Sequence, residues 1–170
     1  SIAIVGVAII KAPDAKAASE TILHAIACGE GVETELFKRG GEEQLREMFM
    51  RATTANISDA MHHKGYLPGI HALRRGLKCA GPALTVWAYP GDWSKPVEAI
   101  DEAEPGTVLV IDAHNMGPAL WGEGASKSCV ARHLAGCVIN GGARDTDEVI
   151  ELGFAVFSSL IAPQAGQPKG

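Results

Sequence analysis

Three side chains that could support a metal-assisted reaction lie between residues 121 and 145. Glu123 is followed by twenty residues and then by the pair Arg144-Asp145. Asp145 offers hard oxygens to Mg²⁺ or Mn²⁺, and an ion such as Mg²⁺ usually keeps waters and takes only one or two protein carboxylates. Arg144 is a planar cation suited to a carboxylate or an enolate oxygen, and Glu123 could hold a metal-bound water. These groups fit a reaction in which a metal polarises a 2-keto group and an arginine stabilises an enolate.

The residues around Glu123 are small. Gly122, Gly124 and Ala125 would let a ligand approach the backbone closely. A helix that starts here has free N–H groups and a positive end, and both favour an anion such as a carboxylate. The pattern therefore predicts an anion site at this helix start.

Plainer explanations of the same residues stay open. Asp145 and Glu148 are three residues apart, which is also the spacing of an ordinary helix-capping pair. A single arginine near a helix start is usually solvated. Asp112, His114 and Asn115 follow a predicted strand and fit a polar crossover loop at least as well as a set of ligands.

Strands and helices alternate around these residues. The short apolar run 107–111 is typical of a buried, parallel strand. The alternation predicts an α/β fold with a mostly parallel central sheet. Ligands collect beyond the carboxyl ends of such strands, so we expect the ends at 112–123 and 141–145 to face one pocket. The predicted strands are 79–89, 107–111, 136–140 and 155–158, and the predicted helices are 96–103, 123–134 and 145–152.

The N-terminal part of the chain is predicted to be separate from this sheet. Residues 2–10 have a strand pattern, 13–28 form a helix stopped by a glycine, and 30–41 are a linker. Asn56 offers a helix N-cap three residues before Asp59. A short amphipathic helix is predicted between the linker and Asn56, with an apolar stripe of Leu45, Met48, Phe49 and Ala52.

Composition excludes several classes of protein. Apolar residues make up 46% of the 170 residues, which is ample for a core. The net charge of −5 disfavours nucleic-acid binding. No apolar run is long enough to span a membrane, and no signal peptide is evident. The cysteines lack metal-ligand spacing and are expected to be reduced core residues in a cytoplasmic protein: Cys28, Cys79, Cys129 and Cys137.

Residues from about 53 to 170 resemble the family that contains RraA and the class II pyruvate aldolases for 4-hydroxy-4-methyl-2-oxoglutarate and 4-carboxy-4-hydroxy-2-oxoadipate. Its aldolases share an acidic residue, twenty residues and then Arg-Asp, which Glu123 and Arg144-Asp145 match. Further matches lie along the chain, at 56–60, 80–86, Pro90-Gly91-Asp92, Pro105-Gly106 and 153–157.

The resemblance implies a role for each matching residue. Gly122, Glu123, Gly124 and Ala125 would hold the pyruvate moiety. Arg144 would bind substrate and stabilise the enolate, Asp145 would ligate Mg²⁺ or Mn²⁺, and Glu123 would position metal-bound water as a proton shuttle. The implied fold is a swivelling β/β/α domain that assembles as a homotrimer or hexamer. The segment Trp93-Ser94-Lys95 differs from the aldolases, so the substrate beyond its pyruvate portion is expected to differ.

The N-terminus resembles a different family. Residues 4–14 look like the last strand and phosphate-loop glycine of a hexulose-6-phosphate synthase barrel, although Val7 replaces the usual arginine. The expected organisation is therefore the tail of a synthase-like barrel at 1–29, a linker at 30–41, and an RraA-like/aldolase domain at 42–170. Because the chain starts at Ser1 and stops in a Gly/Pro loop, we expect a fragment of a fusion, truncated at its C-terminus. An ordinary N-terminal β–α pair is the alternative.

Three functional hypotheses follow. The first is a metal-dependent lyase that cleaves a 4-hydroxy-2-oxo acid, a diacid in the family aldolases, to pyruvate by retro-aldol chemistry and also decarboxylates oxaloacetate. The second is an RraA-like regulator that binds and inhibits a ribonuclease. The third is a non-catalytic oligomerisation domain of the synthase fusion. The intact Arg144-Asp145 pair favours the lyase.

Overall fold

The computed structural model describes residues 9, 12–29 and 41–169. The chain divides into two compact units at Gly41 and Glu42, and each unit is described by itself. The expected strand 2–10 and linker 30–41 lie outside the described residues, except for one residue of each. The synthase resemblance and the domain division therefore stay predictions.

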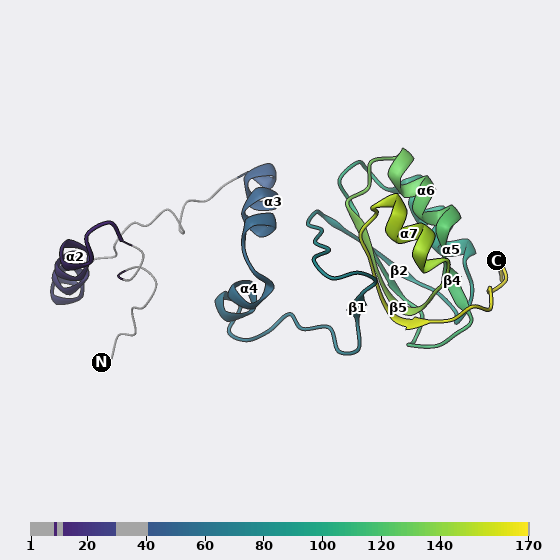
Figure 1. The fold of residues 1–170 in the computed structure, drawn as a ribbon, viewed down its shortest axis with the longest axis horizontal. Coiled ribbons are helices and arrows are strands. Elements are labelled where there is room, and N and C mark those ends of the chain that lie inside the picture. Colours follow the sequence, from purple (N-terminus) through teal and green to yellow (C-terminus); the bar gives the residue numbers. More distant parts are fainter. Residues whose placement is uncertain (1–8, 10–11, 30–40, 170) are drawn as a thin grey trace. The chain divides into compact units, whose positions relative to one another are not determined.

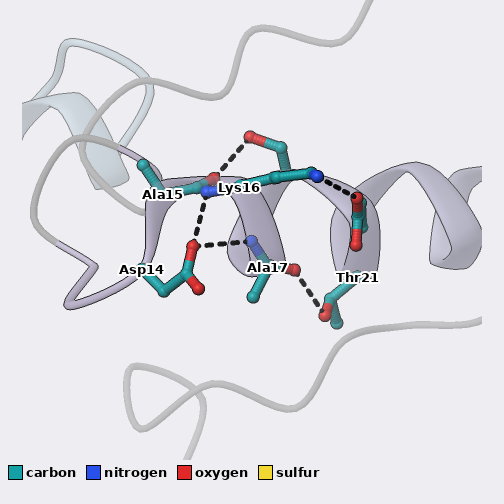
Figure 2. Close-up of polar contacts among 7 residues, drawn as sticks. Asp14, Ala15, Lys16, Ala17 and Thr21 are labelled. Atoms are coloured by element: carbon teal, nitrogen blue, oxygen red, sulfur yellow. Dashed lines mark hydrogen bonds and ion pairs between the residues drawn. The ribbon is translucent and has the colours of Figure 1, made fainter.

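The first unit contains helix α2 (Ala15–Cys28), as the sequence predicts. Its start is fixed by Asp14, whose carboxylate accepts hydrogen bonds from the N–H groups of Lys16 at 2.9 Å and Ala17 at 3.0 Å (Figure 2). Its end is fixed by Gly29, which adopts the left-handed conformation with φ of 68°.

The second unit begins with helices α3 (Glu42–Arg51) and α4 (Thr54–Ala60). The predicted N-cap at Asn56 is wrong, because Asn56 lies inside α4. The cap is Thr53, whose hydroxyl accepts the Asn56 N–H at 3.1 Å from an extended backbone. Asp59 consequently lies in the last turn of α4 and pairs with His63 at 3.2 Å.

A single sheet forms the centre of this unit, in the order β1-β6-β5-β3-β2, with β4 also paired to β5. All pairs are parallel except β1 with β6, so the expected mostly parallel sheet is confirmed. The expected second β layer of a swivelling domain stays a prediction. The strands are β1 (His71–Ala72), β2 (Ala83–Trp87), β3 (Val108–Asp112), β4 (Ala119–Trp121), β5 (Gly136–Ala143) and β6 (Val156–Ile161).

Three helices lie on the same side of the sheet (Figure 1). They are α5 (Ser94–Glu102), α6 (Glu123–Ala131) and α7 (Thr146–Leu152). In β2, Leu84 and Val86 pack against the core while Thr85 and Trp87 are exposed, which is the alternation of a half-buried strand. Large, fully buried apolar side chains come from β3, β5, β6 and the three helices: Leu109, Ile111, Pro96, Cys129, Cys137, Ile139, Val149 and Val156.

Strand β4 was not predicted, and β5 continues three residues beyond its predicted end. Both differences depend on Gly141 and Gly142, residues that rarely indicate a strand. A Cβ at Gly141 would lie 2.9 Å from the Cβ of Ala113, and one at Gly142 would lie 3.0 Å from the Cα of Ala119. The missing side chains therefore let β4 lie directly beside β5.

Two helices differ from their predicted bounds. Helix α5 starts at Ser94 rather than at Pro96. Helix α6 ends at Ala131, three residues early, and His133 just beyond has a φ of 59°, which cannot continue a helix.

The expectations from cysteines and hydropathy hold in part. Burial raises the pKa of Cys129 to about 12 and that of Cys137 well above its ordinary value, so these two are inert core thiols. Cys79 is half-buried, whereas Cys28 is exposed on α2, so its assignment to the core is wrong. Within the described ranges, no helix has the length and apolar character needed to cross a membrane.

Candidate active site

The parallel pairing of β4 with β5 brings Glu123 and the Arg144-Asp145 pair together. The Arg144 N–H donates to the Trp121 carbonyl at 2.9 Å, where β4 ends. The carboxylate of Asp145 then accepts the N–H of Glu123 at 3.2 Å, at the first residue of α6. The twenty-residue spacing is thus closed in space by one helix and one strand. The functional roles of these residues stay predictions.

Asp145 has an unusual backbone, and its carboxylate does not cap its own helix. Its φ of 50° and ψ of 43° lie in the left-handed region, which costs a residue with a side chain of order 1 kcal/mol. It occupies the N-cap position of α7, yet its side chain makes no cap hydrogen bond. The capping-pair explanation therefore fails, because the carboxylate turns toward α6 instead.

Gly122 makes room for that carboxylate. A Cβ at this position would lie 2.5 Å from Oδ2 of Asp145 and 3.3 Å from Cγ of Arg144. The backbone of Gly122 is extended, so the glycine is required by this close approach and not by its dihedral angles.

Hydrogen bonds of Trp121 and Ser126 hold the start of α6 against β4. The buried indole N–H of Trp121 donates to the Ser126 hydroxyl at 2.9 Å, and that hydroxyl donates to the Gly122 carbonyl at 3.0 Å. Because both side chains are buried and hydrogen-bonded, the first turn of the helix is held rigidly against β4.

A cavity of about 230 Å³ opens beside this helix start. Arg144 and Asp145 lie on it with side chains that are 42% and 34% exposed, so both can meet a ligand. Their side chains are 3.4 Å apart, from Nε to Oδ2. The cavity is lined by Trp93, Val97, Ala119, Leu120, Trp121, Gly122, Gly124, Ala125, Arg144, Asp145 and Ala165.

The carboxylate of Glu123 is engaged elsewhere. Its Oε1 lies 2.6 Å from Nζ of Lys127, one helical turn further on, and Glu123 is not among the cavity-lining residues. The two side chains are 38% and 61% exposed, so this ion pair is worth less than about 1 kcal/mol. A rotation of Glu123 toward the cavity is therefore inexpensive. The i,i+4 spacing could have revealed Lys127, which sequence reasoning missed.

Only part of the region 112–123 faces this cavity as expected. Residues 119–122 line it together with Arg144 and Asp145, whereas Asp112 does not. Asp112 lines a different cavity together with Asn140 and Trp87. Its Oδ1 accepts the Asn140 side-chain amide at 2.9 Å and the His114 N–H at 3.0 Å. The Asp112 carboxylate consequently shapes its own loop.

The donor set suits a hydrated divalent cation with one protein carboxylate. Within the part of the chain that the structure describes, no group of three His, Cys, Asp or Glu side chains gathers in a ligand cluster. Asp145 nevertheless presents a half-exposed carboxylate whose partners are one backbone N–H and the Arg144 side chain. That arrangement fits Mg²⁺ or Mn²⁺, for which waters and substrate fill the remaining positions.

Sequence reasoning also missed the structural contacts of Asp92, which it noted only as part of the matching segment Pro90-Gly91-Asp92. Asp92 is 1% exposed and accepts hydrogen bonds from Ser94 and from the N–H of Lys169. Residues near the C-terminus thus return to the cavity, a contact for which local spacing gives no signal.

Comparison with known proteins gives consistent results. Over 124 residues the chain is 33% identical to a candidate 4-hydroxy-4-methyl-2-oxoglutarate aldolase from Halalkalibacterium halodurans, covering 72% of this chain and 59% of the relative. This chain spans only 22% to 59% of the lengths of the first three curated relatives that it matches.

Solved structures share the fold. Streptomyces coelicolor RraAS2, described as an unusual member of the RNase ES inhibitor RraA family, matches with a TM-score of 0.63 and 28% identity, over 77% of this chain and 69% of that one. The RNA-processing inhibitor RraA from Thermus thermophilis matches with a TM-score of 0.63 and 22% identity, over 71% and 74%. The family model described as Aldolase/RraA matches residues 54–170, more than half of the sequence, and the chain therefore belongs to the RraA-like family.

Proposed function

We propose that this protein is a divalent-metal-dependent lyase that cleaves a 4-hydroxy-2-oxo acid to pyruvate. One observation carries the proposal. Arg144 and Asp145, whose carboxylate makes no cap hydrogen bond to α7, line the same cavity as the small residues at the start of α6. A cation, a metal-ligating carboxylate and backbone donors are the groups that a 2-oxo acid needs for recognition.

The substrate carboxylate would lie at the start of α6. The N–H groups of Gly124 and Ala125 belong to the first helical turn, where backbone donors lack intrahelical partners. The N–H of Glu123 is already used by Asp145. Arg144 would bind the 2-oxo end of the substrate from the opposite side.

The chain's own groups would then assist the bond cleavage. A base removes the proton of the 4-hydroxyl, the C3–C4 bond breaks, and a carbonyl forms at C4. The electron pair of the broken bond produces the enolate of pyruvate, whose negative oxygen Arg144 stabilises. Protonation at C3 completes pyruvate, and Glu123 would shuttle the proton after leaving Lys127. Loss of carbon dioxide from oxaloacetate gives the same enolate.

Asp145 would hold the cation, with Mg²⁺ or Mn²⁺ as the proposed cofactor. When bound, such an ion supplies a Lewis acid for the 2-oxo group. Assembly as a homotrimer or hexamer is also part of the proposal, as the resemblance to the family implies.

A regulator of a ribonuclease is the second candidate. It is favoured by the match to RraAS2, whose description names an RNase ES inhibitor family. A domain that only holds subunits of a fusion together is the third candidate, and it predicts no turnover of any 2-oxo acid.

Pyruvate release separates these candidates. The full chain is assayed with 4-hydroxy-4-methyl-2-oxoglutarate and with oxaloacetate, in Mg²⁺ or Mn²⁺ and then with a chelator. We expect release that the chelator abolishes. Absent activity, or activity that survives both the chelator and Asp145→Ala, would contradict the lyase. Capture of a purified cognate ribonuclease by an inactive protein would instead support the regulator.

A further inference from the structure

Residues 164–169, here called the strap, pass beside β4, and Ala165 among them lines the cavity. The Ala119 N–H donates to the Gln164 carbonyl at 2.9 Å, and the Gly166 N–H donates to the Ala119 carbonyl at 2.7 Å. The strap therefore pairs with β4 in the manner of a short parallel strand, centred on Ala165. In Figure 1 this segment is the yellow chain that passes β4 toward the C-terminus.

The strap next crosses the turn at residues 89–92. The Gln167 N–H donates to the Gly91 carbonyl at 3.0 Å, and Nζ of Lys169 donates to the Pro90 carbonyl at 3.0 Å. Gly166 lies so close to Gly91 that any Cβ at position 166 would overlap the Gly91 carbonyl. The close contact therefore requires a glycine at position 166.

A single carboxylate joins the strap to α5. Oδ1 of Asp92 accepts the Ser94 hydroxyl at 2.6 Å, the Ser94 N–H at 3.0 Å and the Lys169 N–H at 3.0 Å. Burial of Asp92 acts to raise its pKa, but these hydrogen bonds outweigh burial and the pKa lies below its ordinary value. The ionised carboxylate is therefore stabilised by donors from the start of α5 and from the strap.

The two segments that Asp92 joins supply one wall of the cavity. Trp93 and Val97 come from the start of α5, and Ala165 comes from the strap. All three are apolar, whereas Arg144 and Asp145 line the same cavity with charged groups. The wall therefore suits the part of a ligand that carries neither the carboxylate nor the 2-oxo group.

We propose that the strap, anchored by the positioning residue Asp92, sets the size limit for the substrate group beyond the pyruvate moiety, with Ala165 as the specificity-determining residue. This inference rests on the proposed function. The substrate group that lies beside Trp93, Val97 and Ala165 is expected to be small and apolar. A residue larger than Ala165 would fill the space that this group occupies. Discrimination by one or two methylene groups in such a pocket is about 10- to 200-fold.

The anchor is tested without any ligand, by hydrogen exchange of the peptide that contains the strap. Asp92→Ala is expected to speed exchange there, and Asp92→Asn is expected to restore protection because it keeps an oxygen acceptor. Gly166→Ala must also speed exchange, by overlap with Gly91. Gln167→Ala is the matched control and is expected to leave exchange unchanged, because the hydrogen bond of Gln167 to Gly91 comes from its backbone N–H and survives the substitution. Unchanged protection in both Asp92→Ala and Gly166→Ala would overturn the anchor.

The size limit is tested by the binding of pyruvate, 2-oxobutyrate and 2-oxopentanoate to the full chain with Mn²⁺, measured by calorimetry. Ala165→Leu is expected to lower the affinity for 2-oxopentanoate relative to pyruvate by at least about 10-fold. Gln167→Ala is expected to leave this ratio unchanged. Wild-type binding with an unchanged ratio in Ala165→Leu would overturn the inference alone, whereas absent wild-type binding would overturn the proposed function as well.

Discussion

Asp112 and Asp145 lie at the carboxyl ends of neighbouring strands in one sheet, and the two positions contrast in what their carboxylates contact. Asp112 ends β3, and its Oδ1 accepts hydrogen bonds from the Asn140 amide and the His114 N–H, so this oxygen closes a loop. Asp145 follows β5, leaves its own helix uncapped, and meets Arg144 and the start of α6.

The contrast shows that position at a strand end does not make a site. Hydrogen bonds from the His114 backbone and the Asn140 side chain lower the pKa of Asp112, and both of them end on Oδ1. Asp145 differs in its neighbours, because its Oδ2 accepts the N–H at the start of α6 and lies beside the Arg144 side chain on the candidate cavity, and its backbone is left-handed. The difference originates in Gly122, whose missing Cβ admits the carboxylate.

The largest expected effect comes from Arg144. Arg144→Ala removes the cation that stabilises the developing enolate, and we expect kcat for pyruvate release to fall about 10²- to 10³-fold. The side chain is half-exposed, so the melting temperature is expected to change little. Steady-state kinetics and thermal melting of the same preparation check both statements. A variant that retains full kcat would remove Arg144 from the mechanism.

Gly122→Ala tests the room beside Asp145. The added Cβ would push Oδ2 of Asp145 away, so we expect a loss of Mn²⁺ affinity of about 10- to 100-fold, the size of effect seen when a ligand is misdirected. Calorimetric Mn²⁺ titration measures it. Gly117→Ala is the matched control, because a Cβ there meets open space. Equal affinities in the two variants would contradict the steric argument.

Asp112→Ala is expected to affect stability instead. Loss of two partly exposed hydrogen bonds should lower the free energy of unfolding by about 1 kcal/mol near pH 7. Because the folded-state pKa of Asp112 is lowered, its contribution is present above the unfolded pKa of about 3.9 and is lost as pH falls through the folded value. Urea unfolding of wild type and variant at several pH values checks this. A stability difference that grows on acidification would contradict it.

The smallest effect is expected from Lys127. Lys127→Met breaks the exposed pair with Glu123, and we expect kcat to change by no more than about 3-fold because such pairs are weak. The pH profile of kcat is the measurement. A loss as large as that of Arg144→Ala would mean that Lys127 itself takes part in the reaction.

Much of the fold follows from local sequence patterns. The alternation from residue 79 onward correctly predicts parallel strands and three helices, and Asp14 and Gly29 mark the ends of α2. The spacing from Glu123 to Asp145 correctly predicts their approach. These features depend on residues close in sequence or on one helix–strand unit.

Long-range contacts were not predictable in this way. Strand β4 is only three residues long, and its pairing depends on the glycines of β5. The strap reaches Asp92 across 77 residues of sequence. The hydrogen bond between Asp112 and Asn140 spans 28 residues of sequence, and no local spacing reports it.

The most direct test compares Asp145→Ala with Asp112→Ala in pyruvate release from 4-hydroxy-4-methyl-2-oxoglutarate at saturating Mn²⁺. We expect Asp145→Ala to lose at least about 100-fold in kcat, through loss of the metal-holding carboxylate. Asp112→Ala, if folded at the assay temperature, is expected to stay within about 3-fold of wild type, because its carboxylate only closes a loop. Equal losses in both variants, or full activity in Asp145→Ala, would contradict the assignment of the site to the end of β5.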